Sequence, residues 1–449
     1  MGDLTSIVKA YDIRGVVPDQ LDEGVAEAVG AAFAAVTEAK TILTVHDMRT
    51  SSGPLADAFG RGAAAQGADV LAAGLGSTDM VYYGSGDLGI PGAMITASHN
   101  PSRYNGIKLC RAGAKPVGIE TGLKDIKDLA ERNLVPAPVP GSITPVDLLP
   151  GYAEYLKKLV DISEIRPLTV AVDAGNGMAG HTVPKVFEGL PVTLIPLYFE
   201  LDGTFPNHEA NPIEPENLRD LQRAVVKHHA DIGLAFDGDA DRCFVVDERG
   251  ELVSPSVLTA LIAARELARE PGATIIHNLI TSRAVPEIIA EHGGVPVRTR
   301  VGHSFIKAKM AECGAVFGGE HSGHFYFRDF WFADSGMLAA LHTLAALGGQ
   351  AKSLSQLMAE YSRYHASGEI NSEVADQAEA TARVKQAFAS RPGVSTDELD
   401  GLTVSARDWW FNLRPSNTEP LLRLNVEASD ETAMAALRDE VLAMVRNGR

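Results

Sequence analysis

Apolar runs that end in a polar loop and lead into a helix recur along this chain, and this recurrence constrains its fold more than any other feature. Such runs, which read as buried strands, lie at residues 41–45, 69–73, 168–172, 232–236 and 274–276. Helices are predicted at residues 54–64 and 216–229, and a third begins at Pro255 with Ser254 as its N-cap. Strands that alternate with helices predict parallel sheets covered by helices, with the functional loops at the carboxyl ends of the strands.

Three stretches mark boundaries along the chain: the proline-rich residues 135–140, the turn at residues 248–250 and the region around residues 361–367. A chain of 449 residues is long enough for three or four domains of ordinary size. The last segment differs from the rest, because an alternating stretch at residues 421–426 precedes one amphipathic helix at about 430–445. This pattern predicts a small α+β domain.

The formal net charge of −18 argues against nucleic acids and anionic membranes as partners, since both require basic surfaces. An anionic small-molecule substrate would therefore need a local basic pocket. Cys110, Cys243 and Cys313 lie far apart without metal-type spacing, as in a protein with reduced thiols. The first residues show no signal-peptide pattern, and no run approaches the length of a membrane span. We therefore expect a cytoplasmic protein; its oligomeric state has no signature in the sequence.

Three aspartates, Asp237, Asp239 and Asp241, follow the predicted strand at residues 232–236. Side chains alternate along an extended chain, so these carboxylates point the same way and repel one another unless a cation neutralises them. Oxygen ligands alone select Mg²⁺ or Ca²⁺. An EF-hand is excluded, because Arg242 stands where that loop requires glycine. An Asp-x-Asp after an apolar strand is also typical of phosphatases with an aspartyl nucleophile, here Asp237, and this alternative stays open on the loop alone.

Ser98 lies in a polar loop behind the apolar residues 93–95, and Pro101 keeps the segment out of helix and strand. A serine hydroxyl is a weak nucleophile that needs a base or a metal beside it. His99 and Lys108 are the nearby candidates. A Ser-His-Asn-Pro tetrapeptide by itself is more typical of a turn or a cap, so the catalytic interpretation rests on its co-occurrence with the other loops.

Two further loops fit a sugar phosphate. Residues 414–420 offer a guanidinium, two hydroxyls and an amide that match a phosphate dianion; these donors belong to Arg414, Ser416, Asn417 and Thr418. A polar turn before a strand is the alternative interpretation. Glu320 and Ser322 lie between glycines, and a carboxylate can accept hydrogen bonds from two vicinal sugar hydroxyls. His324 in the same loop is a candidate acid or base.

These four loops, in this order and together with residues 9–15, closely resemble those of the α-D-phosphohexomutase superfamily, and the resemblance covers essentially the whole chain. It implies three related α/β domains with mixed, mostly parallel sheets and a small α+β C-terminal domain, arranged around a central cleft. The boundary stretches divide the chain into four expected domains. The first, residues 1–148, carries the phosphoserine loop, and the second, residues 149–251, carries the metal loop. The third, residues 252–363, carries the sugar-binding loop, and the fourth, residues 364–449, carries the phosphate-binding loop.

The resemblance also implies a role for each group of residues. Ser98 would be the phosphoserine of the resting enzyme, and the groups that assist transfer would be Arg14, His99, Lys108, Arg242 and His324, with Lys108 or His324 as the general base. One Mg²⁺ would be held by Ser98, Asp237, Asp239 and Asp241. The substrate would contact Tyr11, Arg14, His303, Glu320, His321, Ser322, Gly323, His324, Arg414, Pro415, Ser416, Asn417 and Thr418.

The implied reaction interconverts hexose 6-phosphate and hexose 1-phosphate, of mannose or glucose, through a hexose 1,6-bisphosphate that also serves as primer. The motifs look most like the bacterial phosphomannomutase/phosphoglucomutase branch, with two departures. His321 stands in place of its methionine, and Leu279 in place of a substrate-contacting lysine, for which Lys307 or Arg283 could compensate.

Several alternatives remain open. Glucosamine phosphate is the main competing substrate, and a metal-dependent sugar phosphatase and a non-enzymatic sugar-phosphate sensor are the rival functions. The phosphohexomutase interpretation makes one strict geometric demand: Ser98 must lie within ligand reach of the Asp237 cluster.

Overall fold

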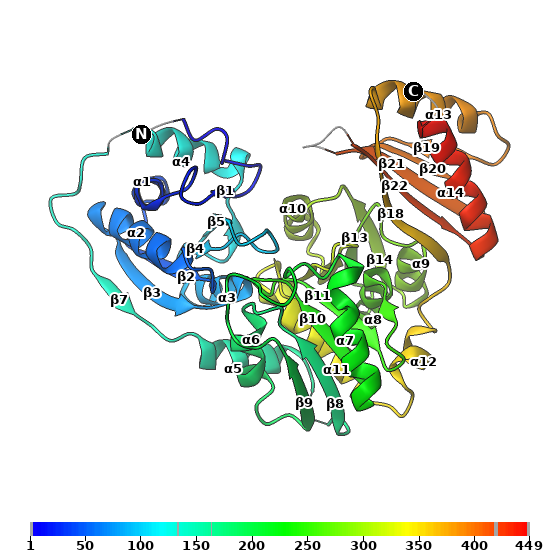
Figure 1. Cartoon of the computed structure of the whole chain (residues 1–449), viewed down its shortest axis with the longest axis horizontal. Helices are drawn as coiled ribbons and strands as arrows, with labels where there is room; N and C mark the ends of the chain where they lie inside the picture. The colour runs from blue at the N-terminus through cyan, green and yellow to red at the C-terminus, as the bar shows by residue number, and fades with distance from the viewer. Residues whose placement is uncertain (1–2, 133, 163, 417–420, 447–449) are drawn as a thin grey trace.

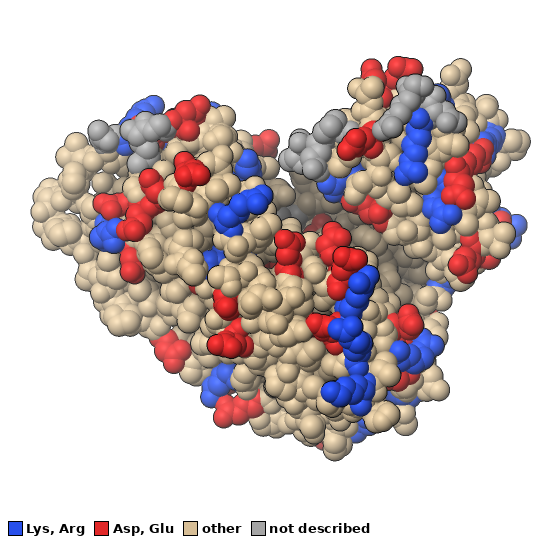
Figure 2. Space-filling model, in the orientation of Figure 1, with Lys and Arg blue, Asp and Glu red and all other residues tan. Residues whose placement is uncertain are grey.

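The computed structural model of the chain describes residues 3–132, 134–162, 164–416 and 421–446, apart from the side chains of His303 and Ser304. The described strands form four sheets, and each sheet with its helices makes one unit, numbered from one to four in chain order. In Figure 1 the first unit is blue and cyan, the second and third run from green to yellow, and the fourth is orange and red. Figure 2 shows the molecule hollowed between the first and fourth units.

The first unit has a seven-stranded sheet in the order β1-β5-β4-β2-β3-β7, with β6 paired to β5. Its strands are β1 (Ile13–Val16), β2 (Thr41–His46), β3 (Asp69–Leu75), β4 (Gly92–Ile95), β5 (Tyr104–Arg111), β6 (Lys115–Pro116) and β7 (Ile143–Pro145). Its helices are α1 (Glu23–Thr37), α2 (Ser52–Ala65), α3 (Thr78–Leu88), the short 3₁₀ turn η1 (Ile119–Thr121) and α4 (Leu123–Ala130).

The second and third units each have a five-stranded sheet. The second contains α5 (Leu149–Leu159), β8 (Leu168–Asp173), α6 (Ala179–Val186), β9 (Val192–Leu197), η2 (Pro215–Leu218), α7 (Arg219–His228), β10 (Ile232–Phe236), β11 (Cys243–Asp247) and β12 (Leu252–Val253). The third contains α8 (Pro255–Arg269), β13 (Thr274–Asn278), α9 (Ala284–Glu291), β14 (Val295–Thr299), α10 (His303–Cys313), β15 (Phe317–Gly319), β16 (Phe325–Phe327), η3 (Arg328–Phe330), β17 (Ala333–Asp334), α11 (Gly336–Gly348) and α12 (Leu354–Met358).

The fourth unit is an antiparallel sheet in the order β18-β22-β21-β20-β19, packed against two helices. Its elements are β18 (His365–Glu373), α13 (Gln377–Ala389), β19 (Ser395–Asp397), β20 (Leu402–Ser405), β21 (Trp409–Pro415), β22 (Leu421–Ala428) and α14 (Glu431–Arg446). The antiparallel pairing and the C-terminal helix agree with the α+β pattern expected from the alternating stretch before that helix.

The first three sheets share a strand order. Counted along the chain within each unit, the second and third sheets both run second, first, third, fourth, fifth, as β9-β8-β10-β11-β12 and β14-β13-β15-β16-β17. Four strands of the first sheet follow the same order, as β3-β2-β4-β5, when the strands of this unit are counted from β2 as the first. The predicted fold class, three related α/β units and a small α+β unit, is confirmed. The antiparallel share is larger than expected, because in each unit the fourth strand folds back along the third.

The shared order explains where the polar loops lie. The third strand of each unit is parallel to the first strand on one side and antiparallel to the fourth on the other. Its carboxyl end therefore lies where the strand direction changes, which is where loops of α/β sheets form sites. The third strands β4, β10 and β15 are followed by the loops of Ser98, Asp237 and Glu320, respectively.

Local structure follows the sequence signals closely. Helix α8 begins at Pro255, and the Ser254 hydroxyl accepts a hydrogen bond from the backbone N–H of Ser256 at 3.3 Å, as its N-cap role requires. Helix α2 begins at Ser52, two residues before the expected Pro54. The domain boundaries after residues 148, 251 and 363 stay a prediction.

One buried core runs through the first three units, and it includes Leu43, Tyr152, Phe236 and Phe330. The fourth unit has a core of its own, centred on residues such as Phe388 and Phe411. Among the described residues, no helix combines the length and the apolar character needed to cross a membrane.

Candidate functional site

The Ser98 loop of the first unit meets the aspartate loop of the second unit. The Oγ of Ser98 donates to Oδ2 of Asp237 at 3.0 Å, although 139 residues separate them. Ser98 is 3% exposed and has a left-handed backbone with φ of 51°. At Gly238 a Cβ atom would lie 2.5 Å from the Ser98 carbonyl oxygen, so the two loops approach this closely only because glycine has no side chain. The demand that Ser98 reach the aspartate cluster is met.

The aspartate cluster has the donor set of a hard-cation site. Asp237, Asp239 and Asp241 are buried, and one carboxylate oxygen from each lies within 4.8 Å of the others. The Oδ1 atoms of Asp239 and Asp241 accept no hydrogen bond from the residues that the structure describes. Burial and the two neighbouring carboxylates raise the pKa of Asp237 well above its usual range. Buried carboxylates repel one another, and a bound Mg²⁺ would offset their negative charge. Mg²⁺ also takes oxygen ligands, which the unbonded carboxylate oxygens of this cluster can supply.

Lys108, on β5, is the cation that contacts this cluster directly. Its Nζ lies 2.7 Å from Oδ2 of Asp239 and 2.6 Å from Oδ2 of Asp241. Burial alone would lower the pKa of the ammonium group, but the two carboxylates outweigh burial and raise it. Lys108 is therefore held in its protonated form, which suits charge neutralisation better than proton abstraction.

Thr78, at the start of α3, holds the same carboxylate from the other side. Its hydroxyl donates to Oδ2 of Asp239 at 2.5 Å, and its backbone N–H donates to the Asp239 carbonyl at 3.0 Å. The next residue, Asp79, accepts hydrogen bonds from the Tyr152 hydroxyl of α5 and from the hydroxyl of Ser335. This buried contact ties α3 to the second and third units and so fixes the aspartate loop against the first.

Further basic groups surround Ser98. Arg14 donates to the side chains of Asn100 and Asp12, each at 2.5 Å, and Nε of Arg242 lies 3.6 Å from Oδ2 of Asp237. The Nδ1 of His99 lies 3.2 Å from the Ser98 Oγ. The positive charge of Arg242, burial and the charge of Arg14 hold the pKa of His99 well below its usual range, so this imidazole is neutral.

Tyr11 lies just before the Asp12–Arg14 ion pair and is 38% exposed. Its expected contact with the substrate stays a prediction.

The third unit contributes the Glu320 loop. Glu320 is buried at the end of β15 and accepts hydrogen bonds from the Tyr326 hydroxyl at 2.7 Å and from the backbone N–H of Gly302 at 3.2 Å. Gly323 has φ of 84°, and a Cβ there would meet the ring of Phe244 at 2.5 Å. The loop is thereby packed against β11, next to the aspartate cluster.

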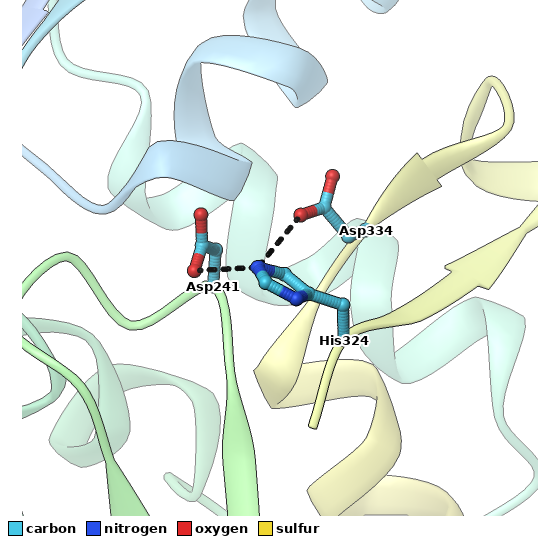
Figure 3. A group of neighbouring side chains, drawn as sticks. All are labelled: Asp241, His324 and Asp334. Atoms are coloured by element: carbon cyan, nitrogen blue, oxygen red, sulfur yellow. Dashed lines mark ion pairs between the residues drawn. The ribbon is translucent and has the colours of Figure 1, made fainter. Parts of the chain in front are cut away.

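His324 is the link between this loop and the aspartates (Figure 3). Its Nε2 lies 3.6 Å from Oδ1 of Asp241 and 3.9 Å from Oδ2 of Asp334, and Nε of Arg242 lies 3.2 Å from the same nitrogen. A guanidinium group only donates, so Nε2 is the acceptor in this contact. Nδ1 lies 3.0 Å from the hydroxyl of Ser322.

Asp241, His324 and Asp334 have the spacing of a second cation site. Two basic groups disfavour it. Arg242 occupies the His324 lone pair, and Nζ of Lys307 lies 2.6 Å from Oδ1 of Asp334. We interpret this group as a network that orients the imidazole ring of His324.

Arg414, on β21, belongs to the fourth unit, which faces the first unit across the hollow seen in Figure 2. Arg414 is directly opposite Arg423 on the neighbouring strand, and both guanidinium groups pair with Glu369, at 2.8 and 3.2 Å. Two facing guanidinium groups repel each other unless an anion lies between them. Arg423 was not expected from the sequence, because its strand position is indistinguishable from that of an ordinary surface residue.

The remaining expected residues vary in how far the structure places them. Pro415 ends β21, Ser416 follows it, and His321 is half-buried in the Glu320 loop, where burial lowers the pKa of its ring. His303 begins α10, but its side chain lies outside the described residues, as do Asn417 and Thr418.

Neither residue proposed to compensate for Leu279 is free to do so in this structure. Leu279 itself is buried. Lys307 is buried with Asp334, and Arg283 donates to the backbone carbonyls of Ala406 and Arg407 at 2.7 and 2.6 Å. Arg283 therefore holds the fourth unit against the third.

Four family models match successive parts of the chain: phosphoglucomutase/phosphomannomutase alpha/beta/alpha domain I at residues 5–134, domain II at 150–250, domain III at 255–364 and the C-terminal domain at 369–444.

Similar proteins match over almost the full length. A phosphomannomutase of Escherichia coli is 40% identical over 450 residues, which cover 98% of each chain. Phosphohexose mutases of Xanthomonas campestris pv. campestris are 40% identical over 444 residues, which cover 98% of this chain and 99% of theirs. The crystal structure of a phosphoglucomutase/phosphomannomutase family protein from Burkholderia thailandensis matches with a TM-score of 0.89 at 32% identity, covering 99% of this chain and 98% of the other.

Proposed function

The chain belongs to the phosphoglucomutase/phosphomannomutase family of the α-D-phosphohexomutase superfamily and is a phosphohexomutase, and on this premise we propose that the phosphoryl group it moves passes through Ser98. The observation that carries this proposal is the 3.0 Å contact between the Ser98 Oγ and Asp237, which joins a hydroxyl of the first unit to the carboxylate cluster of the second. A hydroxyl beside a hard-cation site has the environment that an otherwise weak serine nucleophile requires.

The substrate is held at both ends. Arg414 and Ser416, with Asn417 and Thr418, grip the phosphate that is not transferred, supported by Arg423. Glu320, Ser322 and the other residues of their loop contact the sugar hydroxyls. The opposite hydroxyl of the hexose then faces Ser98.

Proton transfer is assigned to His324. The hexose hydroxyl attacks the phosphoryl group on Ser98, and the bond from phosphorus to the Ser98 Oγ breaks. The hydroxyl proton passes to Nε2 of His324, which the guanidinium group of Arg242 releases when it turns to the transferring phosphoryl group. Its Nδ1 lies 3.6 Å from Oε2 of Glu320, a carboxylate that stabilises the resulting imidazolium. Lys108 is the weaker candidate for the base, because two carboxylates hold it protonated.

Isomerisation requires two transfers. The first produces a hexose 1,6-bisphosphate, which turns over in the site and presents its other phosphate to Ser98. The reverse transfer then restores the phosphoserine and releases the isomer. Free hexose 1,6-bisphosphate would act as primer, because it can phosphorylate Ser98 when that residue has lost its phosphate.

One Mg²⁺ per chain is the cation that best fits the site. Asp237, Asp239 and Asp241 would hold it together with the oxygen of Ser98. When bound it supplies positive charge that offsets the charge spread over the transferring phosphoryl group.

Removal of the divalent ion is expected to abolish turnover, because the three carboxylates would then repel both one another and the phosphoryl group. We expect activity to disappear after treatment with EDTA and gel filtration, and to return when excess Mg²⁺ is added. Calorimetric titration of the stripped protein with Mg²⁺ should give one site per chain. Full activity in the stripped protein would contradict the cation assignment.

Mannose and glucose phosphates are the proposed substrates, because relatives that are 40% identical are named phosphomannomutase and phosphohexose mutases. These two sugars differ only at C2, so a loop that accepts the hexose in two orientations can accept both. We place the enzyme in the cytoplasm, where reduced cysteines and hexose phosphates are expected.

The substrate proposal is tested with a coupled assay of mannose 1-phosphate, glucose 1-phosphate and glucosamine 1-phosphate, each with Mg²⁺ and a trace of bisphosphate primer. We expect formation of the 6-phosphate from the first two, at higher kcat/KM than from the third. A clear preference for glucosamine 1-phosphate would contradict the substrate assignment. Steady release of inorganic phosphate without isomer would instead favour an aspartyl phosphatase.

A further inference from the structure

A single buried guanidinium group organises the loop of Ser98. Arg49 follows β2 and is 3% exposed. Its Nη1 donates to the carbonyls of Pro101 and Tyr104, both at 2.9 Å. Its Nη2 donates to the carbonyls of Ser98 and Asn100, at 2.8 and 2.6 Å. Four carbonyl groups from one seven-residue loop thus converge on one side chain.

A buried carboxylate holds this guanidinium in place. The Nε of Arg49 lies 3.2 Å from Oδ2 of Asp47, and the Asp47 carboxylate also accepts from the hydroxyls of Thr96 at 2.6 Å and Ser52 at 2.5 Å. The Thr96 hydroxyl in turn accepts from the backbone N–H of Ser98 at 2.9 Å. Asp47 therefore holds the backbone of Ser98 at two points. Arg49 links Asp47 to the Ser98 carbonyl, and Thr96 links Asp47 to the Ser98 amide.

The second unit closes over the same side chain. The guanidinium carbon lies 5.1 Å from the centre of the Phe205 ring, and a Cβ at Gly203 would lie 2.5 Å from the Cα of Arg49. The loop that carries Phe205 thus covers Arg49 and leaves it without access to solvent. The contact between the first two units depends on this close packing.

The backbone conformation of Ser98 explains why the hydrogen bonds from Arg49 are needed. Residues other than glycine avoid the left-handed region of backbone dihedral angles. They remain there only when surrounding contacts hold the backbone in that conformation. Carbonyl groups that point to one place also repel one another. Arginine offers five donors in a rigid planar fork, whereas the lysine ammonium offers three donors on a flexible stem. Only the guanidinium group of arginine can donate hydrogen bonds to all four carbonyl groups and to Asp47 at once.

We propose that Arg49 is a positioning residue for phosphoryl transfer, which fixes the backbone of Ser98 so that its Oγ faces the Asp237 cluster. This inference rests on the proposed function, since it concerns the same serine. Arg49 contacts loop carbonyls and not the substrate, so it should govern the rate of transfer to and from Ser98 and leave the binding of hexose phosphate largely intact.

The test is rapid-quench measurement of phosphoryl transfer from labelled hexose 1,6-bisphosphate to the enzyme, in the wild type and in Arg49→Lys. We expect the transfer rate per folded molecule to fall about 10²-fold, the scale of a misplaced reacting group, while the dissociation constant of hexose phosphate changes less than about threefold. Arg111→Lys is the matched control. Arg111 lies in the same unit and donates to the Thr121 carbonyl at 3.2 and 3.4 Å, away from the site, and its transfer rate should be normal.

A second variant separates positioning from folding. Arg49→Gly should regain transfer activity when guanidinium ions are added at concentrations that leave the wild type unaffected, and Arg49→Lys should not. The proposal is overturned by a normal transfer rate per folded molecule in Arg49→Lys, or by a loss that follows the fraction unfolded in a thermal melt. A wild-type enzyme that acquires no label on Ser98 would instead refute the proposed function itself.

Discussion

The variant Ser98→Ala is expected to lose about 10⁴-fold or more of mutase kcat, the scale of loss seen when a covalent nucleophile is removed. The hydroxyl removed is the one that contacts Asp237 and His99, at 3.0 and 3.2 Å, and no phosphoserine can form without it. The substrate groups assigned to the third and fourth units are untouched, so binding of hexose phosphate should persist. The measurement is the coupled assay together with calorimetric titration of the variant with glucose 6-phosphate.

Ser85→Ala serves as the control for loss of a buried serine hydroxyl in the same unit. The Ser85 hydroxyl donates to the Ile90 carbonyl at 2.7 Å, so its removal should cost about 1–3 kcal/mol of stability, but kcat should be preserved. Near-normal turnover in Ser98→Ala would refute the nucleophile assignment. A variant that neither turns over nor binds hexose phosphate would point to a collapsed site instead.

Gly238→Ala should also lower activity, although less than Ser98→Ala and although alanine adds only one carbon. The new Cβ would lie 2.5 Å from the Ser98 carbonyl oxygen, which is itself held by Arg49, so the aspartate loop must move away from the serine loop. A shift of about 1 Å at a reacting centre can cost about 10²-fold in rate. We therefore expect kcat to fall by that order and the affinity for Mg²⁺ to weaken, as followed by the coupled assay and by calorimetry.

The matched control for this change is Gly60→Ala, within α2. There the added Cβ meets side-chain carbons of Val70 and Ile143 at ordinary contact distances of 3.6 and 3.7 Å. Alanine also favours a helix over glycine, so this variant should be at least as stable as the wild type and fully active. If Gly238→Ala retained wild-type kcat, the close approach of the two loops would not be required for transfer.

The elements of the fold were predictable where their signals are local. The central strands are continuous apolar runs, and Ser254 and Pro255 are the N-cap and first-turn residues that predict the start of α8. The short strands were harder. β1 pairs with β5 across about 90 residues, through Ile13 and Ile107, and nothing within a four-residue strand specifies so distant a partner.

The candidate site was partly predictable for a related reason. Ser98, Asp237 and Glu320 each follow a central strand of a separate sheet, and loops at the carboxyl ends of such strands commonly form sites. Chemistry visible in the residue types then identified the loops, and the family resemblance supplied the roles that chemistry alone left open. The assigned roles remain proposals until the variants are measured.

The roles of Arg49 and Thr78 could not be predicted from the sequence, because their hydrogen-bond partners are not neighbours in the chain. Arg49 acts on carbonyl groups about 50 residues away, and Thr78 acts on Asp239, 161 residues away. Carbonyl groups are present in every residue, so nothing in the sequence indicates which of them an arginine will bind. A polar pair directly after a buried strand, as Asp47 and Arg49 are after β2, is the only available signal.

The central claim is that one phosphoryl group passes between the Ser98 Oγ and the hexose, and a pulse–chase experiment with labelled enzyme tests it most directly. The enzyme is labelled with hexose 1,6-bisphosphate carrying ³²P, freed of excess label, and chased with unlabelled glucose 6-phosphate. The account predicts label on the peptide that contains Ser98, stable to hydroxylamine, which moves into hexose phosphates during the chase. Label that is lost to hydroxylamine would place the phosphoryl group on a carboxylate. Label that leaves as inorganic phosphate would show transfer to water and not to the hexose. Either result would contradict the account.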